Sequence, residues 1–177
     1  ADETKYVGGT AYCSRPAQLG QVLAECETNE TIVDVFVPGE LGYPCIRIPS
    51  ILLLDDQQTL LAFAECRNWT GDGCEPHAFA NLTETQPLNS NRDICMKSSS
   101  DGGSTWSELK VLARNAAQPT PVMDTATKTI VMNFNQLSPG DNMQMVSTDK
   151  GVTWSQPRSL KQFLSPIIVS DVGPGVG

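Results

Sequence analysis

The sequence lacks several features that mark common classes of protein. No apolar stretch approaches the roughly 20 residues of a membrane-spanning helix, and runs such as residues 51–54 are only as long as a strand. The 12 Lys and Arg residues are outnumbered by 20 Asp and Glu and are scattered, so we expect no basic face for nucleic acid. With one histidine and no Cys-x-x-Cys pair, a zinc site is disfavoured, and we expect neither a metal ion nor a cofactor.

Turn-forming residues are plentiful, and no helical stripe competes with a strand pattern. The 14 Gly and 12 Pro residues favour many short strands over long helices. Residues 1–30 show no clear periodicity and are interpreted as an N-terminal extension without assigned chemistry. From Thr31 to Gly177, apolar segments alternate with turn signals. The expected strands are residues 32–37, 46–54, 60–66, 93–97, 108–113, 120–123, 129–135 and 143–147.

An even set of cysteines and three glycosylation sequons indicate the secretory pathway. Disulfides and N-glycans belong to the same oxidising route, so we expect a secreted or extracellular protein, with the lysosome as a further destination. No signal peptide is visible, and Ala1 is interpreted as the mature N-terminus. Fifteen disulfide connectivities are open: Cys66 and Cys74 could close a short ring, or either could reach Cys45 or Cys95. The cysteines are Cys13, Cys26, Cys45, Cys66, Cys74 and Cys95, and the candidate glycosylation sites are Asn29, Asn68 and Asn81.

An internal repeat organises the second half of the chain. Residues 99–106 (SSDGGSTW) and 147–154 (STDKGVTW) share the pattern S-x-D-x-G-x-T-W, and Ser99 and Ser147 lie 48 residues apart. This spacing is about that of one four-stranded blade of a β-propeller. Asp can accept hydrogen bonds from its own turn, Gly can adopt φ > 0, and Trp can pack beside the sheet. Both octapeptides are therefore interpreted as structural.

The octapeptide resembles the Asp-box of sialidases and several other propellers, where it lies on the face away from the ligand. We keep all its residues out of the site for this reason. In the first copy they are Ser99, Asp101, Gly103, Thr105 and Trp106, and in the second Ser147, Asp149, Gly151, Thr153 and Trp154.

A second motif carries an arginine within an apolar strand. From the pattern alone, Arg47 in residues 43–50 (YPCIRIPS) is either a buried arginine paired to a structural carboxylate or a guanidinium presented to an anionic ligand. Residues 47–49 resemble the RIP motif of the sialidase (neuraminidase) family, and residues 35–40, 61–67, 118–124 and 172–175 also resemble family segments. We expect Arg47 to be buried, with its guanidinium unpaired by any carboxylate of this chain.

The resemblance implies an all-β fold, a six-bladed β-propeller that removes terminal α-linked sialic acid with retention of configuration. Arg47 matches the first of three arginines that grip the sugar carboxylate, and Arg67 matches a secondary arginine of the same pocket. Asp72 stands where the family places its acid/base aspartate. By its local sequence, Asp72 in TGDG could equally be a turn residue. Arg47, Arg67 and Asp72 should converge at one end of the blades, with both octapeptides at the other.

The chain departs from the family pattern in the loop after Asp72. This loop is long and contains Cys74, the sequon at Asn81 and the only histidine, His77, which we interpret as a surface residue. The sequon at Asn68 adjoins Arg67. A glycan there could crowd the pocket. The alternatives are that the glycan points outward, that the sequon is unused, or that the site has lost its function.

Several catalytic groups of the sialidase family have no matching residue in this sequence. The family uses a tyrosine nucleophile, a glutamate that deprotonates it and two further arginines, all beyond the position of Gly177. Tyr6, Tyr12 and Tyr43 match no nucleophile position. Residues 31–177 suffice for about three blades, so we expect a partner chain or further segment, from cleavage after Gly177 or from shortening of the chain.

Two functions fit these sequence features. The first is a retaining exo-α-sialidase that acts on glycoconjugates, and the second is a catalytically silent, sialidase-like glycoprotein that binds glycans or serves a structural purpose.

Overall fold

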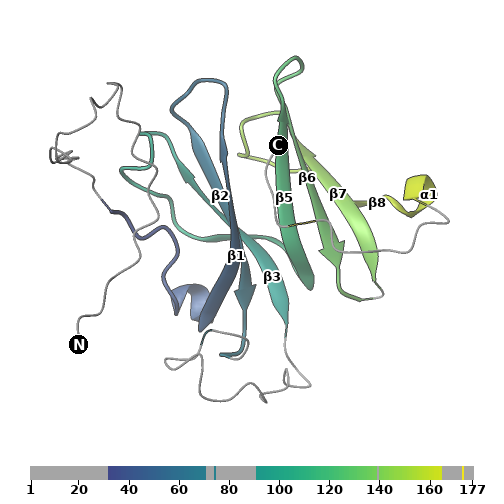
Figure 1. Cartoon of the computed structure of the whole chain (residues 1–177), viewed down its shortest axis with the longest axis horizontal. Helices are drawn as coiled ribbons and strands as arrows, with labels where there is room; N and C mark the ends of the chain where they lie inside the picture. Colours follow the sequence, from purple (N-terminus) through teal and green to yellow (C-terminus); the bar gives the residue numbers. More distant parts are fainter. Residues whose placement is uncertain (1–31, 71–73, 75–90, 139, 165–172, 174–177) are drawn as a thin grey trace, which may run out of the picture. The chain divides into compact units, whose positions relative to one another are not determined.

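The computed structural model describes residues 32–70, 74, 91–138, 140–164 and 173. The chain divides into two compact units, residues 1–32 and 33–177, and the description concerns the second. It is all-β, as predicted: two antiparallel four-stranded sheets lie side by side (Figure 1), the first ordered β1-β2-β3-β4 and the second β5-β6-β7-β8. The strands are β1 (Cys45–Leu53), β2 (Leu60–Arg67), β3 (Arg92–Ser99), β4 (Lys110–Ala113), β5 (Ala116–Asp124), β6 (Thr129–Gln136), β7 (Asp141–Ser147) and β8 (Arg158–Ser159), with η1 (Glu40–Gly42) and α1 (Lys161–Leu164) as short helices.

The main core lies between the two sheets. Leu61 and Phe63 on β2 pack in one cluster with Ile130, Met132 and Phe134 on β6, and all five are fully buried. Burying such a side chain stabilises the fold by about 1.5–3 kcal/mol. Strand β2 is apolar along most of its length because a hydrophobic cluster covers each of its two faces.

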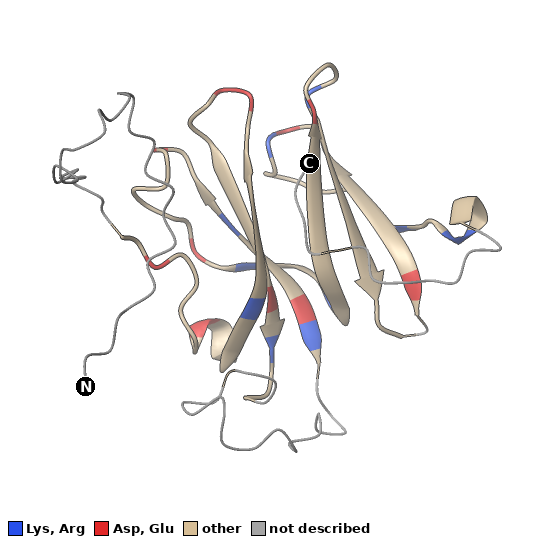
Figure 2. Cartoon of the chain, viewed as in Figure 1, with Lys and Arg blue, Asp and Glu red and all other residues tan. Residues whose placement is uncertain are grey.

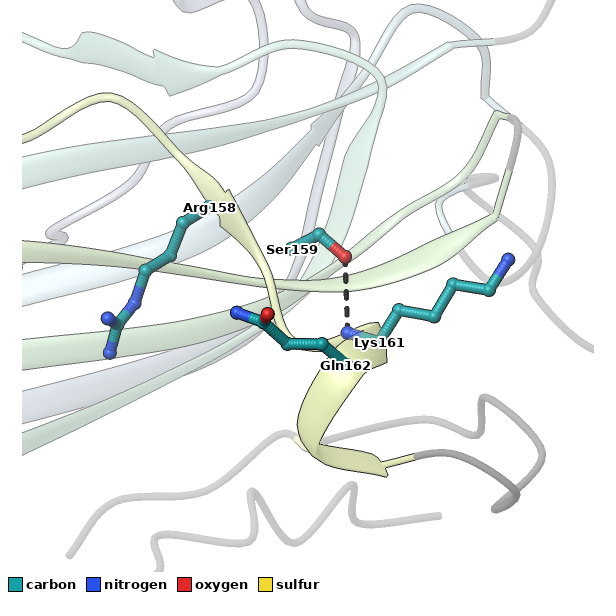
Figure 3. A pocket seen from close by; sticks show the side chains of 4 residues that line it. All are labelled: Arg158, Ser159, Lys161 and Gln162. Carbon is teal, nitrogen blue, oxygen red and sulfur yellow. Dashed lines mark hydrogen bonds between the residues drawn. The ribbon is translucent and has the colours of Figure 1, made fainter.

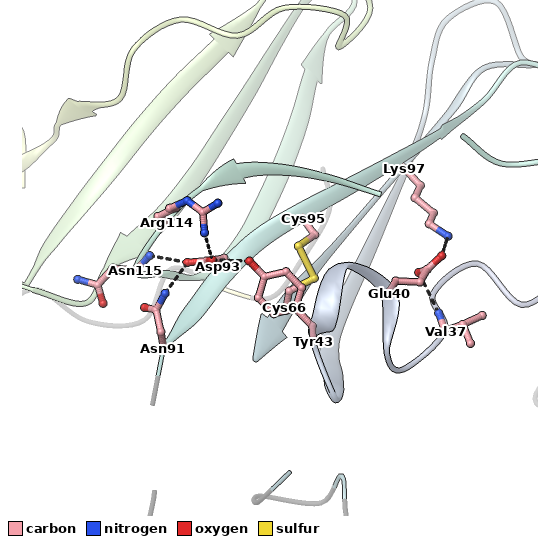
Figure 4. The surroundings of a disulfide bond; sticks show 10 residues. All are labelled: Val37, Glu40, Tyr43, Cys66, Asn91, Asp93, Cys95, Lys97, Arg114 and Asn115. Atoms are coloured by element: carbon pink, nitrogen blue, oxygen red, sulfur yellow. Dashed lines mark hydrogen bonds and ion pairs between the residues drawn. A yellow bond between two sulfur atoms is a disulfide. The ribbon is translucent and has the colours of Figure 1, made fainter. Parts of the chain in front are cut away.

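A smaller core covers the other face of the first sheet. Tyr43, from the segment before β1, packs with Cys66, Cys95 and Leu109, and its hydroxyl donates to Asp93 Oδ2 at 2.5 Å (Figure 4). Burial, followed by the hydrogen bond to this carboxylate, raises the pKa of Tyr43. On the same face Lys97 Nζ donates to Glu40 of η1. These contacts fasten the segment that precedes β1 to the sheet.

The two octapeptides form turns of the same type. In the first, Asp101 accepts from Thr105 N at 2.9 Å and Thr105 Oγ1 at 2.6 Å. In the second, Asp149 accepts from Thr153 N at 2.9 Å and Thr153 Oγ1 at 2.5 Å. The hydroxyl of Thr105, followed by its backbone N–H, holds the pKa of Asp101 down to about 2, and the corresponding groups of Thr153 lower the pKa of Asp149.

The second turn also packs against the first sheet. Trp154 meets Phe63 edge-to-face, with ring centroids 6.0 Å apart, and Gly151 lies so close to Leu61 that a Cβ at Gly151 would be 2.7 Å from Leu61 Cδ1. Lys150 pairs with Asp56 at 2.8 Å in the turn between β1 and β2. The second octapeptide turn thus joins the second sheet to the first.

The first strand of each sheet contains a bulge before a proline. The register of β1 shifts between Arg47 and Ser50, and that of β5 shifts between Ala117 and Thr120. Ile48 and Gln118, which precede the prolines, have φ values of 54° and 60°. This conformation is strained for side chains with a Cβ. Ser50 Oγ donates to Pro119 O at 3.3 Å and so links the two bulges.

The described residues form two four-stranded sheets, a part of the propeller expected for residues 31–177. Two of the expected strands need correction. Residues 32–37 were expected to form a strand and do not form one. The strand expected at residues 120–123 begins at Ala116. Its first residues form the bulge, where a proline and a positive φ disguise the strand pattern.

Candidate functional site

Charged side chains gather at the end of the first sheet that lies opposite the octapeptide turn. Figure 2 shows positively and negatively charged residues close together along the ribbons of β1, β2 and β3. In the backbone register of β1 and β2, Arg47 lies opposite Glu65, and Cys45 lies opposite Arg67. Residues directly opposite in an antiparallel pair project from the same face. Arg47, Glu65 and Arg67 therefore share one face at one end, the arrangement expected for the two arginines.

Glu65 and Arg67 form a buried ion pair. Glu65 is 0% exposed and Arg67 2% exposed. Glu65 Oε2 accepts from Arg67 Nε at 3.1 Å and from Arg67 Nη2 at 2.7 Å. Glu65 Oε1 accepts from the backbone N–H of Gln118, in the bulge of β5, at 3.0 Å. One carboxylate thus holds Arg67 and reaches the second sheet.

Arg47 differs from its expected state. It is partly exposed rather than buried, and it has an interaction partner. Its position explains the exposure, because β1 is an edge strand and Arg47 stands immediately before the bulge. Arg47 is therefore not a buried, unpaired cation.

An aromatic ring lies beside the ion pair. Trp69 is buried, with the guanidinium carbons of Arg67 and Arg92 at 5.4 and 5.5 Å from its ring centroid. Such contacts are attractive because the ring face carries partial negative charge. Sequence reasoning missed Arg92, Trp69 and Glu65. Glu65 had one available signal, since residues 65 and 67 alternate as a charged pair inside an apolar strand.

A disulfide fastens the following loop beside the arginines. Cys74 is bonded to Cys45 with a Cα–Cα distance of 5.5 Å, and Cys45 lies two residues before Arg47 on β1. Cys74 follows Asp72 by two residues, so one end of the segment that contains Asp72 is held at β1. Asp72 itself lies outside the described residues, as do His77, Asn81, Asn29, Cys13 and Cys26.

The second disulfide joins Cys66 to Cys95 across β2 and β3, with a Cα–Cα distance of 6.1 Å. The alternative of a short ring between Cys66 and Cys74 is wrong, and the alternative partners Cys45 and Cys95 are confirmed. Cys66 projects from the face opposite Glu65 and Arg67, since successive strand residues alternate. Cys45 is opposite Arg67 in the register, so Cys45 and Cys66 project from opposite faces of the first sheet at this end.

The sequon at Asn68 adjoins the ion pair in sequence but not in environment. Asn68 is exposed, whereas Arg67 is buried. Asn68 Oδ1 accepts from Asn91 N at 2.7 Å. The position agrees with the alternative in which a glycan points outward.

A separate cleft of about 600 Å³ lies at the outer edge of the second sheet (Figure 3). Arg158, Ser159, Lys161 and Gln162 line it, and none of them is among the predicted site residues. In the described part of the chain, no group of three or more His, Cys, Asp or Glu residues could hold a metal ion. No described helix is both long and apolar enough to cross a membrane.

Comparisons with known proteins point to one fold. No family model matches the sequence, and no curated protein matches it. Among solved structures, Hadza microbial sialidase Hz136 is 18% identical with a TM-score of 0.52, over 71% of this chain and 28% of that protein. The intramolecular trans-sialidase of Ruminococcus gnavus, solved with oseltamivir carboxylate, is 13% identical with a TM-score of 0.61, over 81% of this chain and 54% of that protein. The chain thus spans about a quarter to a half of their lengths, and its described residues have the fold of part of a sialidase β-propeller.

Proposed function

We propose that this chain is part of a retaining exo-α-sialidase that removes terminal sialic acid from glycoconjugates. The observation that carries the proposal is the placement of Arg47 and Arg67 on one face, at the end of the first sheet away from the octapeptide turn. Sialic acid carries a carboxylate, and a planar guanidinium matches a carboxylate with two parallel hydrogen bonds. In a chain of net charge −8, local arginines have to supply this attraction.

Each residue has a distinct task in the proposed site. Arg47, which is partly exposed, binds the substrate carboxylate, and Arg67 shapes the neighbouring part of the pocket. Asp72 donates a proton to the leaving glycosidic oxygen, a step that requires its pKa to lie near the working pH. The Cys45–Cys74 disulfide supports this task by holding the end of the Asp72 segment beside β1.

The proposed reaction needs groups that this chain does not supply. A tyrosine nucleophile, its glutamate and two further arginines come from a further segment or a partner chain. Two sheets alone also leave sheet edges and apolar faces without the cover that a closed propeller gives. Ile51 and Leu53 on β1 are among the exposed large apolar residues, as expected where another part of the propeller packs.

The test is sialoside cleavage by the assembled protein, comparing Asp72→Asn with the unmodified protein. The variant should lose turnover of sialosides with poor leaving groups, by about 10²–10⁴-fold, and lose less with activated aryl sialosides, which need no proton. Asp124→Asn is the control and should retain both activities, because Asp124 ends β5 at the end away from its bulge. Absence of sialoside cleavage by the assembled, unmodified protein would refute the proposal.

One observation favours a second candidate, a sialidase-like glycan-binding or structural glycoprotein without turnover. Arg67 is almost inaccessible and already paired with Glu65, which is also what a purely structural arginine would show. Calorimetry with a sialyllactose separates the two candidates. Binding without cleavage supports a lectin-like role, and neither binding nor cleavage supports a structural one.

A further inference from the structure

The buried carboxylate of Glu65 contacts both an arginine of the first sheet and the backbone of the second sheet. It accepts from Arg67 through both Nε and Nη2, it accepts from Gln118 N on the neighbouring sheet, and it stands directly opposite Arg47 in the β1–β2 register. We propose that Glu65 is the positioning residue of the arginine site: it fixes the plane of Arg67 and fastens the bulge of β5 beside the bulge that follows Arg47. This inference rests on the proposed function.

The contacts with Arg67 are directional. Two adjacent N–H groups of one guanidinium donate to a single oxygen, Glu65 Oε2, so both the position and the plane of the guanidinium are set. The ring of Trp69 then lies against the same guanidinium. A charged acceptor without exposed surface holds its donors firmly, because water cannot replace it. Loss of the carboxylate should release Arg67 even if the strand stays in place.

The contact with Gln118 extends this effect to the second sheet. Gln118 has a φ of 60°, a conformation that persists only where the surroundings enforce it. Glu65 Oε1 accepts a hydrogen bond from the backbone N–H of Gln118. Ser50 Oγ donates a hydrogen bond to the carbonyl oxygen of the next residue, Pro119. The two bulges are therefore coupled at the end of the sheets where Arg47 lies.

The internal repeat shows that Glu65 is not part of the general scaffold. The bulge and the octapeptide turn occur in both sheets, but the pair Arg47–Glu65 of the first sheet is replaced by Ala117–Asn135 at the same register position of the second. An amide cannot form the charge-assisted pair that Glu65 forms. The carboxylate thus occurs where the arginines occur, as a positioning residue should.

The experiment compares Glu65→Gln and Glu65→Asp in the assembled protein with Asp93→Asn as the matched control. Asp93 is also a buried carboxylate at this end of the sheet, 1% exposed, but it bonds Tyr43, Asn91, Arg114 and Asn115 instead (Figure 4). Glu65→Gln should raise KM for a sialyllactose by about 10- to 10²-fold, the scale for a misplaced binding group, with a smaller change in kcat. Glu65→Asp should restore part of the loss, and Asp93→Asn should lower stability without raising KM.

A second readout is independent of catalysis. Hydrogen exchange of the Arg67 Nε–H and of the backbone N–H of Gln118 can be followed by NMR. Both exchange rates should be slow in the unmodified protein and in Asp93→Asn, and faster in both Glu65 variants. Unchanged exchange and KM in a folded Glu65→Gln protein would overturn the inference. If Glu65→Gln does not fold, Glu65→Asp decides by the same two measurements. If the unmodified protein cleaves no sialoside, the proposed function fails, while the exchange rates still show whether Glu65 positions these groups.

Discussion

The two sheets share a scaffold and differ at one end. Each has a bulge before a proline in its first strand and an octapeptide turn after its third. At the other end the first sheet has Arg47 and Glu65, where the second has Ala117 and Asn135. Features that occur in both sheets hold the fold together, and the features that occur in only one sheet are candidates for function.

The largest expected effect comes from removing the arginine that only the first sheet has. Arg47→Ala should lower kcat/KM of the assembled protein for a sialoside by about 10²–10⁴-fold, the scale for losing a charged contact that anchors the substrate. Lys128→Ala serves as the control, because Lys128 pairs with Asp55 at the turn end of the sheets. Equal effects of the two substitutions on steady-state kinetics would mean that the two ends do not differ in function.

A smaller effect should separate the two turns. Alanine at either Gly103 or Gly151 is strained by a positive φ, of 93° and 84°, which costs about 1–2 kcal/mol. At Gly151 the new Cβ would also be 2.7 Å from Leu61 Cδ1, against 3.2 Å from Leu60 Cδ1 at Gly103. Gly151→Ala should therefore lower the free energy of unfolding by about 1–3 kcal/mol more than Gly103→Ala, as measured by urea denaturation. A larger loss for Gly103→Ala would contradict the packing of the second turn on the first sheet.

The smallest effect concerns what the turns have in common. The pKa of Asp101 is lowered to about 2 by Thr105, from an unfolded value of about 3.9, and the pKa of Asp149 is lowered in the same way. Because the folded pKa is depressed, the stabilisation is present above about pH 4 and is lost as the pH falls towards 2. The Tm difference between the unmodified protein and Asp101→Asn should therefore shrink from pH 6 to pH 2.5. A constant difference would show that the charge of Asp101 does not support the turn.

Much of the scaffold was predictable because its interactions are local. The turns, most strand positions and the all-β class follow from patterns within ten residues, such as the hydrogen bonds from Thr105 to Asp101 and from Thr153 to Asp149. Arg47 and Arg67 became candidates through family motifs that span only a few residues, and the β1–β2 register places them on one face. The partial exposure of Arg47 was not predictable, because it depends on which strand forms the edge of the sheet.

The sequence by itself determined most of the strands and the two repeated turns, and it indicated Arg47, Arg67 and Asp72 as candidates for a site. Only the tertiary structure decided that Cys45 bonds Cys74 and that Cys66 bonds Cys95, and that Glu65 bridges Arg67 to Gln118 on another sheet. The reason is physical: a turn is closed by groups four residues apart, whereas these contacts join segments that meet only after strands have paired in one register and two sheets have packed.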